Sequence, residues 1–181
     1  MIVIARYRLE RDNADKHKIK VKSEEESICP VCLGEILNVI GSRNRSALES
    51  NGEKLTIVIR RLRCITCKKI HHELPDFLVP YKRYLGECIE AIIEGEHEQI
   101  ACESSTIYRL RRWFEAIKVH IKGSLASVAA RNKVDIRMAA DGSTLNMIKV
   151  YVSKEPGWLS RAVRIVVNTN NWVHTRNAFM T

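Results

Sequence analysis

A repeated cysteine motif is the feature that most constrains how this chain can fold. The segments CPVC and CITC each hold two cysteines separated by two residues, and 31 residues lie between the segments. The four cysteines are Cys29, Cys32, Cys64 and Cys67. A two-residue gap lets both sulfurs of a pair turn toward one ion, and two pairs supply the four tetrahedral ligands of a closed zinc site. The spacing predicts one structural Zn²⁺ ion bound by these thiolates.

Redox chemistry and chance spacing are the alternatives for these cysteines. A redox dithiol is typical of one CxxC at the start of a helix within a βαβ pattern, and neither pair has that setting. Four cysteines also leave no open position for a catalytic zinc. Whether His71 or His72 replaces a thiolate stays open, and we favour positions beside the ligands or facing phosphates. Cys88 and Cys102 lie in apolar helical patterns, which predicts buried thiols.

A β-hairpin is predicted between the cysteine pairs. EILNVIG and KLTIVIRRLRC are rich in Ile, Val and Leu, and Leu55, Ile57 and Ile59 alternate with their neighbours as in a half-exposed strand. The polar stretch between them contains the turn signal Asn51-Gly52 and predicts a long loop with a basic tip. A hairpin whose ends carry two cysteine pairs is a zinc ribbon. Before it we expect a short strand in MIVIARY and then a charged arm.

Positive charge is concentrated in two regions of the chain. The net charge is +9 and the pI is near 9.4. Residues 54–84 carry eight Lys or Arg against two acids, residues 85–103 carry six acids and no Lys or Arg, and residues 104–137 again carry eight against two. Such an excess favours polyanions, meaning nucleic acid or an acidic membrane surface. From the ribbon region, the residues predicted to contact phosphates are Arg43, Arg45, Arg60, Arg61, Arg63, Lys68 and Lys69.

Helical spacing follows the ribbon. We predict helices over 81–94, with Gly95 as a C-terminal cap, over about 96–102, and from 105 onward, with Ser104 or Ser105 as N-cap. These three pieces match a helix-turn-helix in part, because Glu96 and His97 fall where apolar or small residues are usual. The third helix is either a recognition helix or an ordinary basic amphipathic helix. Its predicted DNA-contacting residues are Ser104, Ser105, Thr106, Tyr108, Arg109, Arg111, Arg112 and Lys118.

The last third of the chain is apolar and mainly helical. GSTLNMIKVYVSK has helical spacing, and EPGWLSRAVRIVVN starts with a proline suited to a first turn, although VRIVV leaves a strand open. Most of its apolar residues are expected in the core. Whether this region also forms a dimer or partner surface stays open.

Two long stretches carry a family resemblance: CPVC…IRRLRCITCKKIHHELPDFLVPYKRY and ESSTIYRLRRWFEAI, with WLSRAVRIVVNTNNWVHTRNAFM at the C-terminal end. Together they resemble a bacterial family of unknown function that joins a zinc ribbon to a helix-turn-helix and is often encoded near transposase or integrase genes. The resemblance covers about residues 28–118. The ribbon and helices also look like the N-terminal DNA-binding region of insertion-sequence transposases. This implies DNA binding in a mobile-element setting, without catalysis, because no RNase-H-like domain is recognisable.

The predicted architecture is therefore α+β. Its parts are an N-terminal strand and arm (1–27), a zinc ribbon (28–78), a helix-turn-helix-like domain (79–131) and a C-terminal helical extension (132–181). The predicted function is a zinc-stabilised, non-catalytic DNA-binding protein that recognises element ends or a promoter in double-stranded DNA. A transposase or integrase protein and a homodimer through the C-terminal region are further candidate partners.

Alternatives to this function are a zinc-ribbon adaptor for a transposase or the transcription machinery and, less favoured, a transposase or nuclease fragment. No Walker loop, GxGxxG, nucleophile elbow or HExxH occurs, so no enzyme is predicted. The chain also shows no secretory signal and no apolar run long enough to span a membrane. A cytoplasmic location without membrane contact is expected, and thiols stay reduced there.

Overall fold

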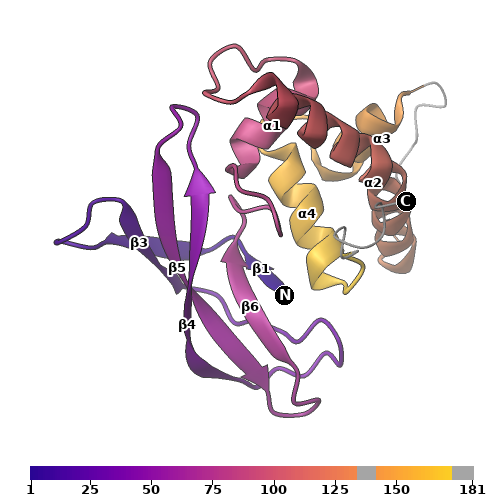
Figure 1. Ribbon diagram of the computed structural model, residues 1–181. Coiled ribbons are helices and arrows are strands. Elements are labelled where there is room, and N and C mark those ends of the chain that lie inside the picture. Colours follow the sequence, from indigo (N-terminus) through magenta and orange to yellow (C-terminus); the bar gives the residue numbers. More distant parts are fainter. Residues whose placement is uncertain (134–141, 173–181) are drawn as a thin grey trace.

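The computed structural model of the protein describes residues 1–133 and 142–172. In these parts of the chain, a six-stranded sheet lies on one side and four helices lie on the other (Figure 1). The strands are β1 (Ile2–Ile4), β2 (Tyr7–Arg11), β3 (Lys18–Ser23), β4 (Leu37–Leu48), β5 (Lys54–Cys64) and β6 (Ile70–Pro75). The helices are α1 (Gly86–Glu94), α2 (Ser104–Arg131), α3 (Thr144–Val152) and α4 (Trp158–Asn168). The predicted α+β class is confirmed.

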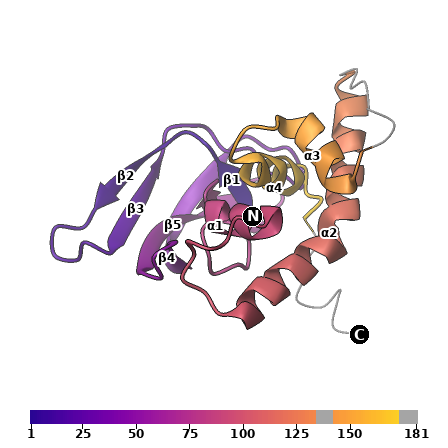
Figure 2. The same ribbon diagram turned by 90° about the horizontal axis from the view of Figure 1, so that it is seen from above.

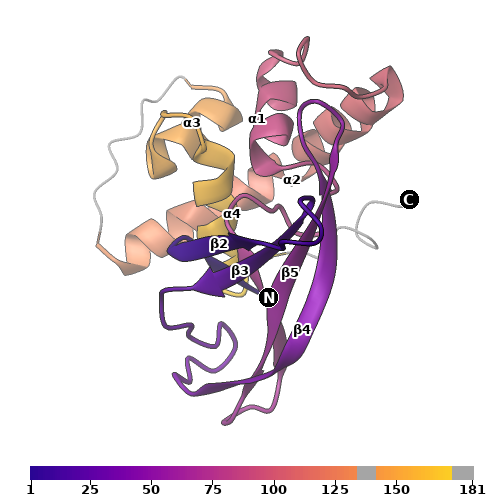
Figure 3. The same cartoon turned by 90° about the vertical axis from the view of Figure 1, so that its left-hand side faces the viewer.

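Strand β5 is the centre of the sheet. β4 pairs with it antiparallel along one edge, while β3 and β6 share its other edge. β3 runs parallel to β5 beside residues 56–58, and β6 runs antiparallel beside residues 61–63. Beyond them, β1 pairs parallel with β6 and β2 pairs antiparallel with β3. β4 is therefore an outer strand, which Figure 3 shows along the edge of the sheet.

The apolar core lies between β1, the central strands and the helices. α4 contacts β1, where the side chain of Asn168 donates to the carbonyl of Val3 and accepts from its N–H, both at 2.8 Å. α2 runs along the other three helices (Figure 2) and packs against each of them. Its apolar stripe is buried at Leu110, Phe114, Ile117 and Ile121. The helices of the described ranges are too short or, like α2, too polar to span a lipid bilayer.

Several predicted elements are confirmed. The hairpin between the cysteine pairs is β4–β5, and Asn51-Gly52 lies in its turn. The helix expected from 105 is α2, and α1 ends at Gly95, whose φ of 95° is the left-handed conformation typical of a helix cap. The last third forms α3 and α4, which share the core with β1; residues 134–141 and 173–181 lie outside the described residues.

Other expectations are corrected by the structure. Residues 8–27 are not an arm, because half of them form the paired strands β2 and β3. The polar stretch expected as a loop is strand β4, so Arg43 and Arg45 lie within a strand and not at a loop tip. β4 tolerates this polar sequence because it is an outer strand with most residues exposed.

The helix predicted over 96–102 is wrong. These residues form turns, and the segment is tied to the hairpin because Ala101 donates its N–H to the carbonyl of Ser50 at 2.7 Å. α2 begins at Ser104 with Glu103 as N-cap and no side-chain cap bond, so neither serine caps the helix. Without the middle helix, the helix-turn-helix unit is not confirmed.

Candidate metal centre and basic surface

Four thiols from two distant segments meet at one end of the β4–β5 hairpin. Cys29 and Cys32 precede β4, Cys64 ends β5, and Cys67 lies in the turn to β6. Their Sγ atoms lie within 4.8 Å of one another, with 3.6 Å between Cys29 and Cys67 and 3.5 Å between Cys32 and Cys64. Tetrahedral bonds of about 2.3 Å place sulfurs about 3.8 Å apart. The predicted ligands are therefore brought together and suit one metal ion.

The two cysteine pairs have matching backbone geometry. Leu33 donates its N–H to the carbonyl of Cys29 at 2.9 Å, and Lys68 donates its N–H to the carbonyl of Cys64 at 3.1 Å. Leu33 and Lys68 follow their pairs directly, and both adopt a φ of 61°. The N–H of each first cysteine also bonds a carbonyl five residues further on, at 2.9 and 3.0 Å. The same turn therefore occurs twice, and each time one residue adopts an uncommon backbone conformation. This repetition argues against a chance approach of four thiols.

Gly34 keeps space open beside the sulfurs. A Cβ atom at this position would lie 2.9 Å from Oγ1 of Thr66 and 3.4 Å from the Sγ atoms of Cys32 and Cys64. Only a residue without a side chain fits between the two pairs without displacing them.

Backbone amides prepare one of the thiols to ionise. The N–H of Cys67, assisted by the N–H of Thr66, lowers the pKa of Cys64 to about 6. The N–H of Gly34 acts on Cys32 in the same direction, but burial and the neighbouring thiols outweigh it and raise the pKa of Cys32 to about 12. The pKa values of Cys64 and Cys32 are thus shifted in opposite directions, and a bound cation would favour the thiolate form of both.

His71 lies beside the thiols and outside the group of four ligands. Its Nε2 is 3.3 Å from Sγ of Cys29, and its side chain is buried. Burial, together with positive charges that include Lys69, lowers the pKa of His71 to about 4, so the imidazole is neutral and able to donate Nε2–H to the sulfur. A neighbour of this kind orients a metal-binding thiolate.

A buried ion pair lies next to this centre. Arg60 donates Nε–H to one carboxylate oxygen of Glu73 at 2.6 Å and Nη2–H to the other at 2.7 Å. The hydroxyl of Ser27 donates to the same carboxylate at 2.8 Å, and Glu73 is 1% exposed. The bidentate pair joins β5 to β6. Arg60, predicted to contact phosphate, is thus engaged inside the fold.

Positive side chains gather on the other face of the sheet. Residues directly opposite in a sheet share a face, as do alternate residues of a strand. Arg61 lies opposite His72, and Arg43 and Arg45 lie opposite Ile59 and Ile57, which alternate with Arg61 along β5. The basic sheet face consists of Arg43, Arg45, Arg61, Arg63 and His72.

Four of these side chains, Arg43, Arg45, Arg61 and His72, are close enough to influence one another electrostatically. Burial first, and then the charges of Arg43 and Arg61, lower the pKa of His72. Burial and the charge of Arg43 also lower the pKa of Arg45. Arg45 donates to the carbonyl of Lys82 at 3.0 Å. No carboxylate of the described chain pairs with the arginines of this face, although Arg60 on the opposite face is fully paired.

The remaining predicted contacts divide into exposed and engaged groups. Lys68 and Lys69 are exposed in the turn after β5. On α2, the exposed residues are Ser104, Ser105, Tyr108, Arg109, Arg111 and Arg112, while Thr106 and Lys118 are half-buried.

Two predicted α2 contacts serve the fold. Arg111 donates to the carbonyl of Ile92 at 2.9 Å and so satisfies the C-terminal end of α1, and Lys118 pairs with Glu115. Arg109 bonds within its own helix, to Oγ1 of Thr106 at 3.1 Å.

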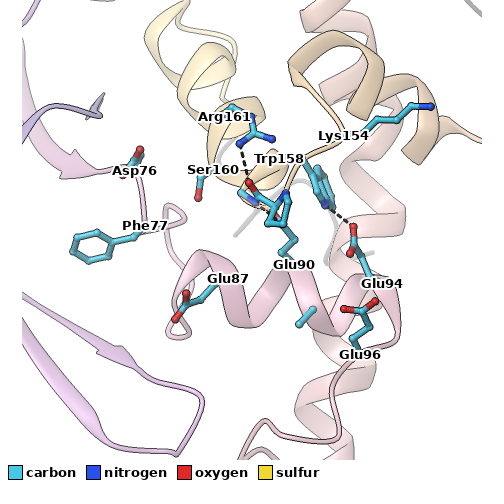
Figure 4. Close-up of a pocket in the computed structure, with 13 residues that line it drawn as sticks. Asp76, Phe77, Glu87, Glu90, Glu94, Glu96, Lys154, Trp158, Ser160 and Arg161 are labelled. Carbon is cyan, nitrogen blue, oxygen red and sulfur yellow. Dashed lines mark hydrogen bonds between the residues drawn. The ribbon is translucent and has the colours of Figure 1, made fainter.

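An acidic hollow near α1 and α4 is a second candidate site, shown in Figure 4. Two of its carboxylates are used by the fold. Glu90 accepts the N–H groups of Gly157 and Leu159 at 2.6 and 2.8 Å, where α4 begins. Glu94 accepts Nε1–H of Trp158 at 2.7 Å. These contacts account for Glu90 and Glu94 as groups that hold the start of α4 against α1.

Sequence reasoning misses part of the surface. It leaves His72 either as a metal ligand or, as favoured, beside the ligands or facing phosphates, and it assigns no DNA contact to Tyr81, Lys82 and Arg83. All three of the latter line a groove between the hairpin and α2. The run YKRY after Pro80 mixes aromatic and basic residues, which is the signal that could have found them.

The fold and site define an α+β protein with a four-cysteine candidate metal centre and a basic sheet face. Residues 29–113 match a family described as a domain of unknown function (DUF6431). That segment runs from the first cysteine pair into α2, and it agrees with the expected resemblance to a family of unknown function. No curated protein and no solved structure matches the chain.

Proposed function

We propose that the protein is a zinc-stabilised, non-catalytic protein that binds double-stranded DNA through the basic sheet face. The observation that carries this proposal is the cluster of Arg43, Arg45, Arg61 and His72, which repel one another and have no carboxylate partner among the described residues. Gathering like charges on a partly buried face costs free energy, and binding to a polyanion offsets this cost. Arginine forks suit phosphate oxygens because they donate two parallel hydrogen bonds.

Zinc is the metal that the ligand set favours. Four thiolates in a closed tetrahedral arrangement are typical of structural zinc, and no ligand position is left for catalysis. The ion would be held by Cys29, Cys32, Cys64 and Cys67. Its contribution is to join the segment before β4 to the end of β5, which fixes the strand that carries Arg61 and Arg63.

The N-terminal part of α2 is the proposed second contact with DNA. Tyr108, Arg109 and Arg112 are exposed there, and the helix N-terminus favours phosphate. α2 is proposed to act without the helix-turn-helix partner that the sequence suggested. The family resemblance supports mobile-element DNA, at element ends or a promoter, as the target.

The double variant Arg43→Ala/Arg61→Ala tests the proposal. Fluorescence anisotropy with a mixed-sequence duplex should show affinity reduced roughly 30-fold at physiological salt, the effect of two lost phosphate contacts. The matched control is Arg8→Ala/Lys22→Ala, which removes the same charge from β2–β3, where both residues pair with acids. Equal losses of duplex affinity in the two variants would mean that net charge alone determines binding. That result would contradict a specific role for the basic sheet face.

A protein-interaction adaptor is the second candidate function. Large apolar side chains are exposed around the cysteine pairs: Leu33 is 71% exposed and Ile36 is 64% exposed. Ile65 is exposed too. It lies beside Ile36, because its N–H donates to the carbonyl of Ile36 at 3.1 Å. Exposed apolar groups of this kind mark protein contacts. Co-purification with a transposase or polymerase subunit, lost in Leu33→Asp, together with no retardation of DNA in a gel, would favour the adaptor.

A further inference from the structure

Tyr81 is held in a conformation that tyrosine rarely adopts. Its φ is 64°, and its side chain is 45% exposed. Hydrogen bonds on the following residue keep the turn in place, because the carbonyl of Lys82 accepts from Arg45 at 3.0 Å and its N–H donates to the carbonyl of Val79 at 3.1 Å. Lys82 also lies over the ring of Trp113, with Nζ 4.1 Å from the ring centre. Uncommon backbone conformations of this kind concentrate at binding sites.

The turn presents Tyr81 at the edge of a groove. This groove of about 830 Å³ lies between the end of the β4–β5 hairpin, residues 81–84 and the first turns of α2. Backbone hydrogen bonds fix its walls: Leu48 donates to the carbonyl of Arg83 at 2.7 Å, and Ala101 donates to the carbonyl of Ser50 at 2.7 Å. The groove is therefore formed before any ligand arrives.

Positively charged side chains lie near Tyr81. Lys82, Arg83 and Arg109 line the groove with one acid, Glu103. Arg45, which belongs to the basic sheet face, is close enough to act electrostatically on Tyr81. Tyr81 therefore lies near cations of both the groove and the basic sheet face.

We propose that Tyr81 stacks on an unpaired base and that the groove beside it binds single-stranded DNA continuing from a duplex on the basic sheet face. Sites for single strands combine a positive groove with aromatic faces on which bases stack, because every base offers a flat surface. The bases of an intact duplex are stacked on one another, so its ends or an overhang must supply the unpaired base. This inference rests on the proposed duplex binding and adds the form of DNA that is preferred.

The test compares a short blunt duplex with the same duplex carrying an oligo-dT overhang. Wild-type protein should bind the overhang substrate more tightly in fluorescence anisotropy. Tyr81→Leu should reduce affinity for it by about 5- to 150-fold, the range for loss of one stacked base, and leave blunt-duplex affinity unchanged. Tyr81→Phe is the matched control, since it retains the ring, and should behave as wild type. A fluorescent adenine analogue in the overhang should be quenched by wild type and Tyr81→Phe only.

The outcomes separate the two proposals. Tight blunt-duplex binding with no overhang preference overturns the stacking site and leaves duplex binding intact. The stacking site is also overturned if Tyr81→Leu, with a wild-type melting temperature, binds the overhang as tightly as Tyr81→Phe does. Binding of the overhang strand alone, with no affinity for duplex, overturns the proposed duplex function and supports the stacking site.

Discussion

Replacing Gly34 by alanine should weaken metal binding. The new Cβ would lie 2.9 Å from Oγ1 of Thr66, which can rotate away, and 3.4 Å from the sulfurs of Cys32 and Cys64, which cannot both retreat while they bind one ion. The backbone of Gly34 is not left-handed, so the effect is steric. Overpacking of this size costs about 1–3 kcal/mol, which corresponds to a metal dissociation constant raised by about 5- to 150-fold.

Competition with a chromophoric zinc chelator measures this change. Gly123→Ala is the matched control, because a Cβ there meets no atom within 4 Å and the residue lies inside α2. This control should bind metal as wild type does and gain up to about 1 kcal/mol in the free energy of unfolding, the helix preference of alanine over glycine. Wild-type zinc affinity in Gly34→Ala would refute the proposed packing of the thiols.

Three further perturbations test the fold around the site. Glu73→Ala should lower the free energy of unfolding in urea by about 3 kcal/mol. Arg60→Ala should lower it by more, because it leaves the buried carboxylate of Glu73 unpaired, whereas Glu73→Ala leaves a guanidinium that reaches water. The reverse order would contradict the ion-pair account. Glu90→Gln should cost about 1–2 kcal/mol by removing the acceptor for one of two amides at the start of α4, which a thermal melt detects. Burial lowers the pKa of Lys82 in the folded protein to about 8, from its ordinary value of 10.5. Between these pH values the unfolded chain binds more protons than the folded protein, so the free energy of unfolding should rise with pH from 8 to 10.5. Lys82→Met should flatten this rise.

Local patterns are enough to predict the four cysteines of the candidate metal centre and several elements. The two CxxC pairs carry their own geometry, because a two-residue gap brings two sulfurs to one side of a turn. Likewise the apolar stripe of α2 depends on the spacing within one helix, and its residues Leu110 and Phe114 are buried. Strand β3 escapes prediction although Ile19 and Val21 alternate with lysines, a period-two signal that the high charge of the segment conceals.

The roles of individual charges are beyond the sequence. Nothing near Arg60 shows that β6 returns beside β5 and sets Glu73 against it, and nothing near Arg111 shows that its guanidinium reaches the end of α1. Strand pairing decides which arginines stay unpaired, and pairing is a long-range property. The sequence of β4 resembles a loop because outer strands tolerate sequences with few apolar residues. Only its pairing with β5 shows that it is a strand.

The salt dependence of duplex binding, measured with zinc bound and after chelation, tests the central claim most directly. Four arginines of the basic sheet face in contact with phosphates predict a slope of log affinity against log salt of about −3 to −4, or steeper if α2 contributes. Chelation should abolish binding, because the strands that carry these arginines lose the cross-link between their ends. A slope near zero, or the same affinity and slope without zinc, would contradict the account.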